Sequence, residues 1–189
     1  MKVKMIVSLV VICLGAAALL SIVYDFTTKK IEEEKRAKVL TQLQEVFPFA
    51  GVSFRPIIRD TLWAVYKGEE KLGIVFKTQK AGYGGTVETM VGLNLDTTVV
   101  AIRPATPAEG LKETPGLGTK ICEAWFKDQF KGKKPKEILL KKDGGTLDAI
   151  TGATISSRAV TDGVRVGIEK YKKYLSKQAI KQPSYQESK

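Results

Sequence analysis

The segment with the clearest chemical potential places a threonine hydroxyl at the start of a helix. A short apolar run, residues 147–150, precedes the sequence Thr-Gly-Ala-Thr at 151–154, and a long amphipathic pattern follows it. The first turn of a helix carries backbone N–H groups without intrahelical partners and the positive end of the helix dipole. A phosphate group at Thr154 is therefore favoured. A plain helix start is the simpler interpretation, because threonine is common at that position.

Two glycine-rich segments come earlier in the chain. Residues 113–118 read Glu-Thr-Pro-Gly-Leu-Gly and lead into a predicted helix, and residues 81–85 read Ala-Gly-Tyr-Gly-Gly. Proline fixes one backbone angle and glycine permits close backbone approach, so such loops pack flat against rings or phosphates. An ordinary turn explains either segment taken alone. Residues 81–85 are not a dinucleotide-binding motif, because no strand-to-helix unit with a later acidic residue surrounds them.

In content and order, the three segments resemble those of the covalent-FMN proteins, the family of the RnfG and NqrC subunits. The resemblance implies that a flavin transferase joins FMN to Thr154 through a phosphoester. It also implies a cofactor-binding set of Glu113, Thr114, Leu117, Gly118, Thr151, Gly152, Ala153 and Ser157. The transferase recognition sequence implied by the resemblance comprises Asp148, Gly152, Ala153 and Thr154.

The chain departs from the family pattern at two places. Thr151 stands where the family often has serine, and Gly110-Leu111-Lys112 stands where a histidine often precedes the Glu-Thr-Pro string. Any role of that histidine is absent here. The modest length of 189 residues looks more like RnfG than the longer NqrC.

The composition excludes several classes of site. The chain has no histidine, which removes imidazole acid–base catalysis, histidine-dependent nucleophile systems and imidazole metal sites. Its two cysteines, Cys13 and Cys122, cannot form a zinc site by themselves and are interpreted as packing residues. The net charge is +11, but lysines are scattered and no aromatic interleaving suggests nucleic-acid binding. We therefore expect no catalytic acid or base, no metal and no nucleic acid, with membrane lipid as a contact for the basic surface.

An uncharged apolar run at residues 5–24 is long enough to cross a bilayer as one helix. A cleaved signal peptide ending near Ala16-Ala17-Ala18 is the alternative. The apolar run continues past those alanines, which favours an uncleaved anchor. Lys2 and Lys4 favour a cytoplasmic N-terminus, so the domain is expected on the extracytoplasmic side of a prokaryotic cell membrane.

The remaining patterns predict an α+β fold with a mainly antiparallel sheet flanked by helices. Strand patterns at 61–66 and 72–77 predict one hairpin, and those at 86–93 and 97–102 predict a second. Further strand patterns occupy 137–140 and 147–150, and helical patterns occupy 28–46, 119–130 and 155–175. In the helix at 119–130, Ile121, Cys122, Trp125, Phe126 and Phe130 are expected to face inward. We predict an anchor at 1–27, a connecting helix at 28–48, an FMN-binding domain at 49–176 and a polar, disordered tail at 177–189.

The resemblance implies an electron-transfer subunit of an Rnf-type complex, which couples ferredoxin:NAD electron transfer to Na⁺ or H⁺ translocation. Its expected partners are the other membrane subunits and the flavin transferase, and it is not catalytic alone. The C subunit of a Na⁺-pumping NADH:quinone reductase, or another FMN electron carrier, is one alternative. A membrane-anchored basic module that binds anionic lipid or polymer without a cofactor is an alternative of a different class.

Overall fold

The computed structural model describes residues 2–176, which fall into two compact units, one ending at Thr41 and one beginning at Gln42. The first unit consists of the greater part of helix α1 (Lys2–Val46), whose last residues belong to the second unit. The boundaries predicted after residues 27 and 48 stay predictions. The predicted tail at 177–189 lies outside the described residues.

Within α1, residues Ile6–Tyr24 form a stretch of 19 residues with a mean hydropathy of 2.9. None of this stretch is buried within the protein, and its length and composition suffice to cross a membrane. Cys13 lies in this stretch and is exposed.

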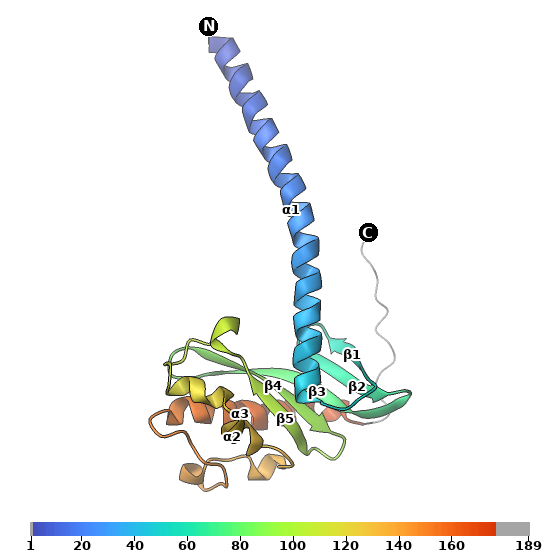
Figure 1. The fold of residues 1–189 in the computed structure, drawn as a ribbon, viewed down its shortest axis with the longest axis vertical. Coiled ribbons are helices and arrows are strands. Elements are labelled where there is room, and N and C mark those ends of the chain that lie inside the picture. The colour runs from blue at the N-terminus through green and yellow to red at the C-terminus, as the bar shows by residue number, and fades with distance from the viewer. Residues whose placement is uncertain (1, 177–189) are drawn as a thin grey trace. The chain divides into compact units, whose positions relative to one another are not determined.

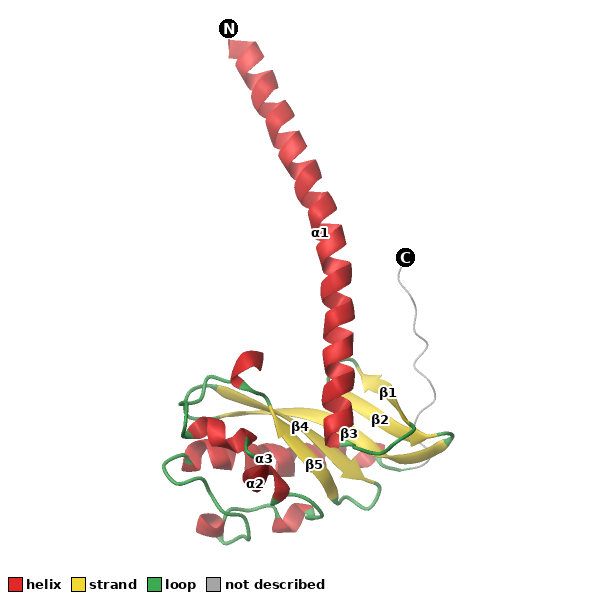
Figure 2. Ribbon diagram, in the orientation of Figure 1, coloured by secondary structure: helices red, strands yellow, loops and turns green. Residues whose placement is uncertain are grey.

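The second unit is built on a five-stranded antiparallel sheet with the strands in sequence order (Figures 1 and 2). Its two predicted hairpins are confirmed, because β2 pairs with β3 and β4 pairs with β5. The sequence patterns missed the edge strand β1, which contains Pro56 and pairs only with β2. The strands are β1 (Val52–Ile58), β2 (Leu62–Lys67), β3 (Glu70–Ala81), β4 (Thr86–Asn94) and β5 (Val99–Pro104).

The long C-terminal helix α3 (Thr154–Tyr171) packs on β3 and β4 and is followed by the 3-10 turn η5 (Lys172–Tyr174). Glycines at positions 163 and 167 let the helix approach the sheet closely, and Gly167 lies against the ring of Phe76. The predicted helix at 155–175 is therefore confirmed up to Tyr171. It starts at Thr154, as the Thr-Gly-Ala-Thr segment predicts.

The predicted helix at 119–130 is wrong in its continuity. The chain forms a 3-10 turn, η2 (Gly118–Cys122), then an extended residue, Glu123, and then a short helix, α2 (Ala124–Asp128). Trp125 was expected to face inward but is 46% exposed, and its indole N–H donates to Glu123. The break allows Ile121, Phe126 and Phe130 to be fully buried from two separate segments.

The strands predicted at 137–140 and 147–150 are also wrong. The two segments share one isolated parallel bridge, Leu140 to Leu147, and no ladder. Their apolar side chains are buried all the same, since Ile138, Leu140, Leu147 and Ile150 all join the core. The apolar pattern here indicated which residues are buried, but it did not indicate the secondary structure. The backbone groups form their hydrogen bonds in 3-10 turns and loops.

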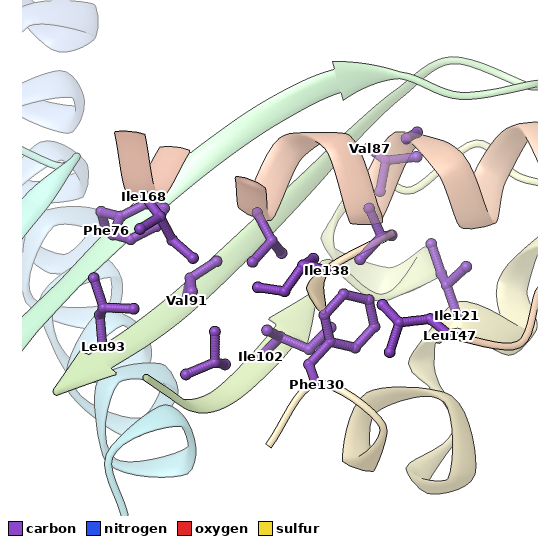
Figure 3. Close-up of a cluster of buried hydrophobic side chains, with 14 of the residues drawn as sticks. Phe76, Val87, Val91, Leu93, Ile102, Ile121, Phe130, Ile138, Leu147 and Ile168 are labelled. Atoms are coloured by element: carbon purple, nitrogen blue, oxygen red, sulfur yellow. The ribbon is translucent and has the colours of Figure 1, made fainter. Parts of the chain in front are cut away.

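One hydrophobic core lies between the sheet and the segments that cover it (Figure 3). Phe76, Val91, Leu93 and Ile102 project from the strands toward Ile168 of α3 and toward Phe130. Since side chains alternate between the faces of a strand, Gly92 lies on the face opposite Val91 and Leu93.

That opposite face holds the last turn of α1. Val46 packs directly on Gly92, and Leu43, Val46 and Phe47 are almost fully buried. A polar cluster closes the contact: Arg103 of β5 donates to Glu45 at 2.5 Å and to Glu109 at 2.8 and 2.9 Å. The hydrogen bonds from Arg103 to Glu109 are the main cause that lowers the pKa of Glu109 to about 2.

Candidate functional site

The start of α3 is set by a tight turn in the Thr-Gly-Ala-Thr segment. The N–H of Ala153 donates to the carbonyl of Ile150 at 3.0 Å, and Gly152 has a φ of +79°. A positive φ at the third residue of such a turn calls for glycine. Thr154 follows as the first residue of α3 and is half-buried, so its hydroxyl lies at the surface where the helix begins.

Ser157 secures this turn from inside the protein. Its buried hydroxyl accepts a hydrogen bond from the N–H of Ile150 at 2.9 Å and donates to the carbonyl of Ala153 at 3.0 Å. Ser157 thus holds the two residues that flank the turn. The structure therefore shows that Ser157 positions the turn. Its predicted contact with the cofactor stays a prediction.

A single buried carboxylate joins the three motif segments. Oε2 of Glu113 accepts a hydrogen bond from the hydroxyl of Ser156 in α3, at 2.7 Å. Its Oε1 accepts from the N–H groups of Tyr83, at 2.9 Å, and of Gly84, at 3.3 Å. Glu113 is only 5% exposed, and its hydrogen bonds span 30 residues toward the N-terminus and 43 toward the C-terminus.

Gly118 permits this junction. A methyl group at position 118 would clash with the carboxylate of Glu113 and would lie 3.1 Å from the hydroxyl of Ser156. The Glu-Thr-Pro-Gly-Leu-Gly loop can therefore close over Glu113 only with glycine at its last position. The structure brings residues 81–85, 113–118 and 151–157 together.

One lysine reaches the hydroxyl of Thr154, and an arginine lies one turn further along α3. Lys142, in the 3-10 turn η4 (Lys141–Asp143), places Nζ 3.4 Å from Oγ1 of Thr154. Arg158, one turn along α3, donates two hydrogen bonds to Asp143, at 2.8 and 3.0 Å. These bonds hold the pKa of the Asp143 carboxyl below its ordinary value and raise that of Arg158.

The other predicted site residues lie at the surface around Thr154 or just below it. Ala153 is buried, whereas Thr114, Leu117, Thr151 and Gly152 are exposed. Leu117 reaches across to Gly152, so the loop 113–118 touches the turn before α3. Asp148 is exposed and pairs with Lys141 at 2.8 Å.

Sequence reasoning missed three contributors: Ser156, Lys142 and the N–H groups of the 82–85 loop. One hint for Ser156 was available in the sequence, because it directly precedes the predicted site residue Ser157. Lys142 gave no signal, because it is one lysine among many and lies 12 residues from Thr154.

The donors around Thr154 fit a phosphate-bearing flavin. A hydroxyl can carry the phosphate, an ammonium group faces its oxygen, and the first turn of α3 presents backbone N–H groups. Leu117, which contacts Gly152, and Ile155, the next residue after Thr154, have exposed side chains that supply apolar surface on which a planar ring could rest.

A groove of the domain lies elsewhere. It has a volume of about 410 Å³ and runs along the exposed end of β3, where Lys77, Lys80 and Lys170 line it together with Tyr171. It begins 12 residues along α3 from Thr154, about 18 Å by helical rise. None of the predicted flavin residues lines it.

The sequence of this chain is similar to those of known proteins. Residues 82–169 match the model of the FMN-binding domain, which spans all three motif segments except Ala81. The chain is 34% identical to the G subunit of the Na(+)-translocating ferredoxin:NAD(+) oxidoreductase complex of Acetobacterium woodii, over 86% of this chain and 88% of the relative. It is 31% identical to the G subunit of the ion-translocating oxidoreductase complex of Methanosarcina acetivorans, over 88% and 92%.

Among solved structures, NqrC of Shewanella oneidensis aligns with a TM-score of 0.49 and 19% identity, over 60% of this chain and 59% of that one. The two G-subunit relatives match over nearly their whole length, and the FMN-binding model falls on the residues that Glu113 draws together. The chain therefore belongs to the RnfG family, whose members are subunits of ion-translocating oxidoreductase complexes.

Proposed function

We propose that this chain carries FMN in a phosphoester linkage to Thr154 and relays electrons as the G subunit of an Rnf-type membrane complex. The observation that carries the proposal is the placement of the Thr154 hydroxyl. It lies at the surface where α3 begins, next to an ammonium group and beside loops joined by Glu113.

Attachment is a group transfer to the threonine oxygen. The O–H bond of Thr154 and a phosphorus–oxygen bond of an activated flavin, a phosphoanhydride of FMN, both break. A new bond joins Oγ1 to phosphorus, and the proton leaves with the displaced phosphate-containing group. Relative to free FMN and free protein, the product lacks one water.

Covalent attachment suits a domain on the extracytoplasmic side, where lost FMN could not be replaced from the cytoplasm. FMN supplies reversible electron transfer, and the protein positions it and adjusts its potential through hydrogen bonds and nearby charge. No residue of the chain has to act as an acid or base, in keeping with the absence of histidine.

The relatives favour the Rnf-type complex over a quinone reductase, because the two that are 34% and 31% identical to this chain are named as G subunits. We propose a single-pass protein of the prokaryotic cell membrane, anchored by Ile6–Tyr24, with the N-terminus in the cytoplasm and the domain outside. Its partners are the other subunits of the complex, the flavin transferase that matures it, and membrane lipid.

The test is expression with an active flavin transferase, followed by ultraviolet fluorescence of the band after denaturing electrophoresis and intact mass. The wild-type chain should fluoresce and carry one FMN-minus-water increment on the peptide that contains Thr154. Thr154→Ala should give a dark band of unmodified mass, whereas Thr154→Ser should keep the flavin.

Thr41→Ala is the control, because it removes an exposed threonine hydroxyl from α1 and leaves the whole Thr-Gly-Ala-Thr segment in place. Flavin should remain on Thr154 in that variant. Covalent flavin retained at full stoichiometry in Thr154→Ala would refute the assignment, and a dark wild-type band despite an active transferase would refute the function.

A further inference from the structure

Lys142 makes a contact that its neighbours in the sequence do not. Its Nζ lies 3.4 Å from Oγ1 of Thr154, and the two residues come from different elements, η4 and α3. This is a long hydrogen bond from an ammonium to a neutral hydroxyl. It would become a charge-assisted one if the same oxygen carried a phosphate.

Two other cations of this region, Lys141 and Arg158, are already paired with carboxylates. Lys141 pairs with Asp148 at 2.8 Å, and Arg158 pairs with Asp143 at 2.8 Å. These pairs occupy both carboxylates of the segment 141–148, and Lys142 forms no ion pair with any side chain that the structure describes. Of the three cations, only the ammonium of Lys142 has its charge directed at Thr154.

The turn that carries Lys142 is fixed in place. Leu140, which precedes it, is fully buried, and the N–H of Gly144 closes it on the carbonyl of Lys141. Arg158 lies four residues after Thr154, on the same face of α3, and its two hydrogen bonds to Asp143 tie the turn to that face. The position of Lys142 beside Thr154 is therefore built into the fold.

We propose that Lys142 is the positioning residue for the phosphoester on Thr154. Before attachment it orients the hydroxyl, and afterwards it pairs with the single negative charge of the phosphodiester. A lysine suits this task, because its ammonium acts as a compact point charge with three rotatable donors. This inference rests on the proposed attachment of FMN to Thr154.

The test compares Lys142→Gln, Lys142→Arg and a control, Lys67→Gln, which removes the same charge from an exposed lysine at the end of β2. Initial rates of flavin attachment are measured by intact mass with a purified transferase and a flavin phosphoanhydride. We expect Lys142→Gln to be about fivefold slower than wild type, and Lys142→Arg and Lys67→Gln to stay close to wild type.

The second readout is the ³¹P resonance of the oxidised, fully loaded proteins, which reports on the phosphodiester and not on the transferase. The resonance of Lys142→Gln should be shifted from that of wild type and Lys67→Gln. Added salt should move the wild-type resonance toward the Lys142→Gln position and leave the variant unchanged, because salt screens an exposed ion pair.

Mapping of the flavin separates the two proposals. Flavin on a residue other than Thr154 would overturn the attachment site itself. Flavin on Thr154 with equal rates and coincident, salt-independent resonances in wild type and Lys142→Gln would overturn only the role of Lys142. A loss of rate in Lys142→Arg as large as in Lys142→Gln would also overturn it, because the charge is retained.

Discussion

The carboxylate of Glu113 accepts a 2.7 Å hydrogen bond from the hydroxyl of Ser156, and both groups are buried. Through its other oxygen, the same carboxylate holds the loop at residues 82–85. This contact connects the start of α3, which carries Thr154, to the two glycine-rich segments that precede it in the sequence. Glu113 is thus a support beneath the proposed flavin site, and its predicted contact with the flavin ring or its side chain stays a prediction.

Glu113→Ala should destabilise the domain by about 3 kcal/mol, because it leaves the donors of Tyr83, Gly84 and Ser156 without their acceptor. Glu113→Gln should cost about 1 kcal/mol, since the amide keeps one acceptor oxygen and adds a donor. Urea unfolding of the flavin-free protein, followed by tryptophan fluorescence, measures both. Equal losses in the two variants would contradict a role based on hydrogen bonding.

Gly167→Ala should destabilise the domain by about 1–2 kcal/mol. A methyl group there would clash with the ring of Phe76, and the overpacking outweighs the gain of about 1 kcal/mol in helix propensity. Gly163→Ala, one turn earlier on the same face, is the matched control. Its methyl group would meet Lys80 and Thr78 at 3.4 Å, an ordinary contact, so this variant should be neutral or more stable by up to about 1 kcal/mol.

The free energies of unfolding of these two variants, measured by thermal and urea unfolding, should therefore change in opposite directions or by clearly different amounts. If Gly163→Ala destabilised the domain as much as Gly167→Ala, the close approach of α3 to Phe76 would not be the cause.

Glu109 should make stability depend on pH in the acid range. Its pKa falls from 4.5 to about 2 in the folded protein, chiefly because Arg103 donates to it. A depressed folded pKa means that this stabilisation is fully present above about pH 4.5 and is lost as the pH falls toward 2.

Glu109→Gln should therefore flatten the fall in the free energy of unfolding between those pH values, with little change in its slope above pH 5. Urea titrations at a series of pH values measure the effect, and Glu69→Gln, at an exposed turn, serves as the control. An unchanged acid dependence in Glu109→Gln would show that other carboxylates dominate it.

The sequence by itself determined the structural features that depend on residues close together in the chain. Alternation of apolar side chains predicted the hairpins β2–β3 and β4–β5, and the Thr-Gly-Ala-Thr segment predicted the start of α3. The composition and order of the motifs were sufficient to indicate the family. These signals are local because a turn, a strand pattern and a helix start each depend on a few consecutive residues.

The tertiary structure decided what depends on distant residues. The break at Glu123 arises where Ile121, Phe126 and Phe130 enter the core from two segments, and the apolar stretches around 137–150 are buried without forming strands. The contacts of Glu113 with Ser156 and of Lys142 with Thr154 join residues 43 and 12 positions apart. Such contacts leave no periodic pattern in a single sequence, because they are fixed only when the separate elements pack together.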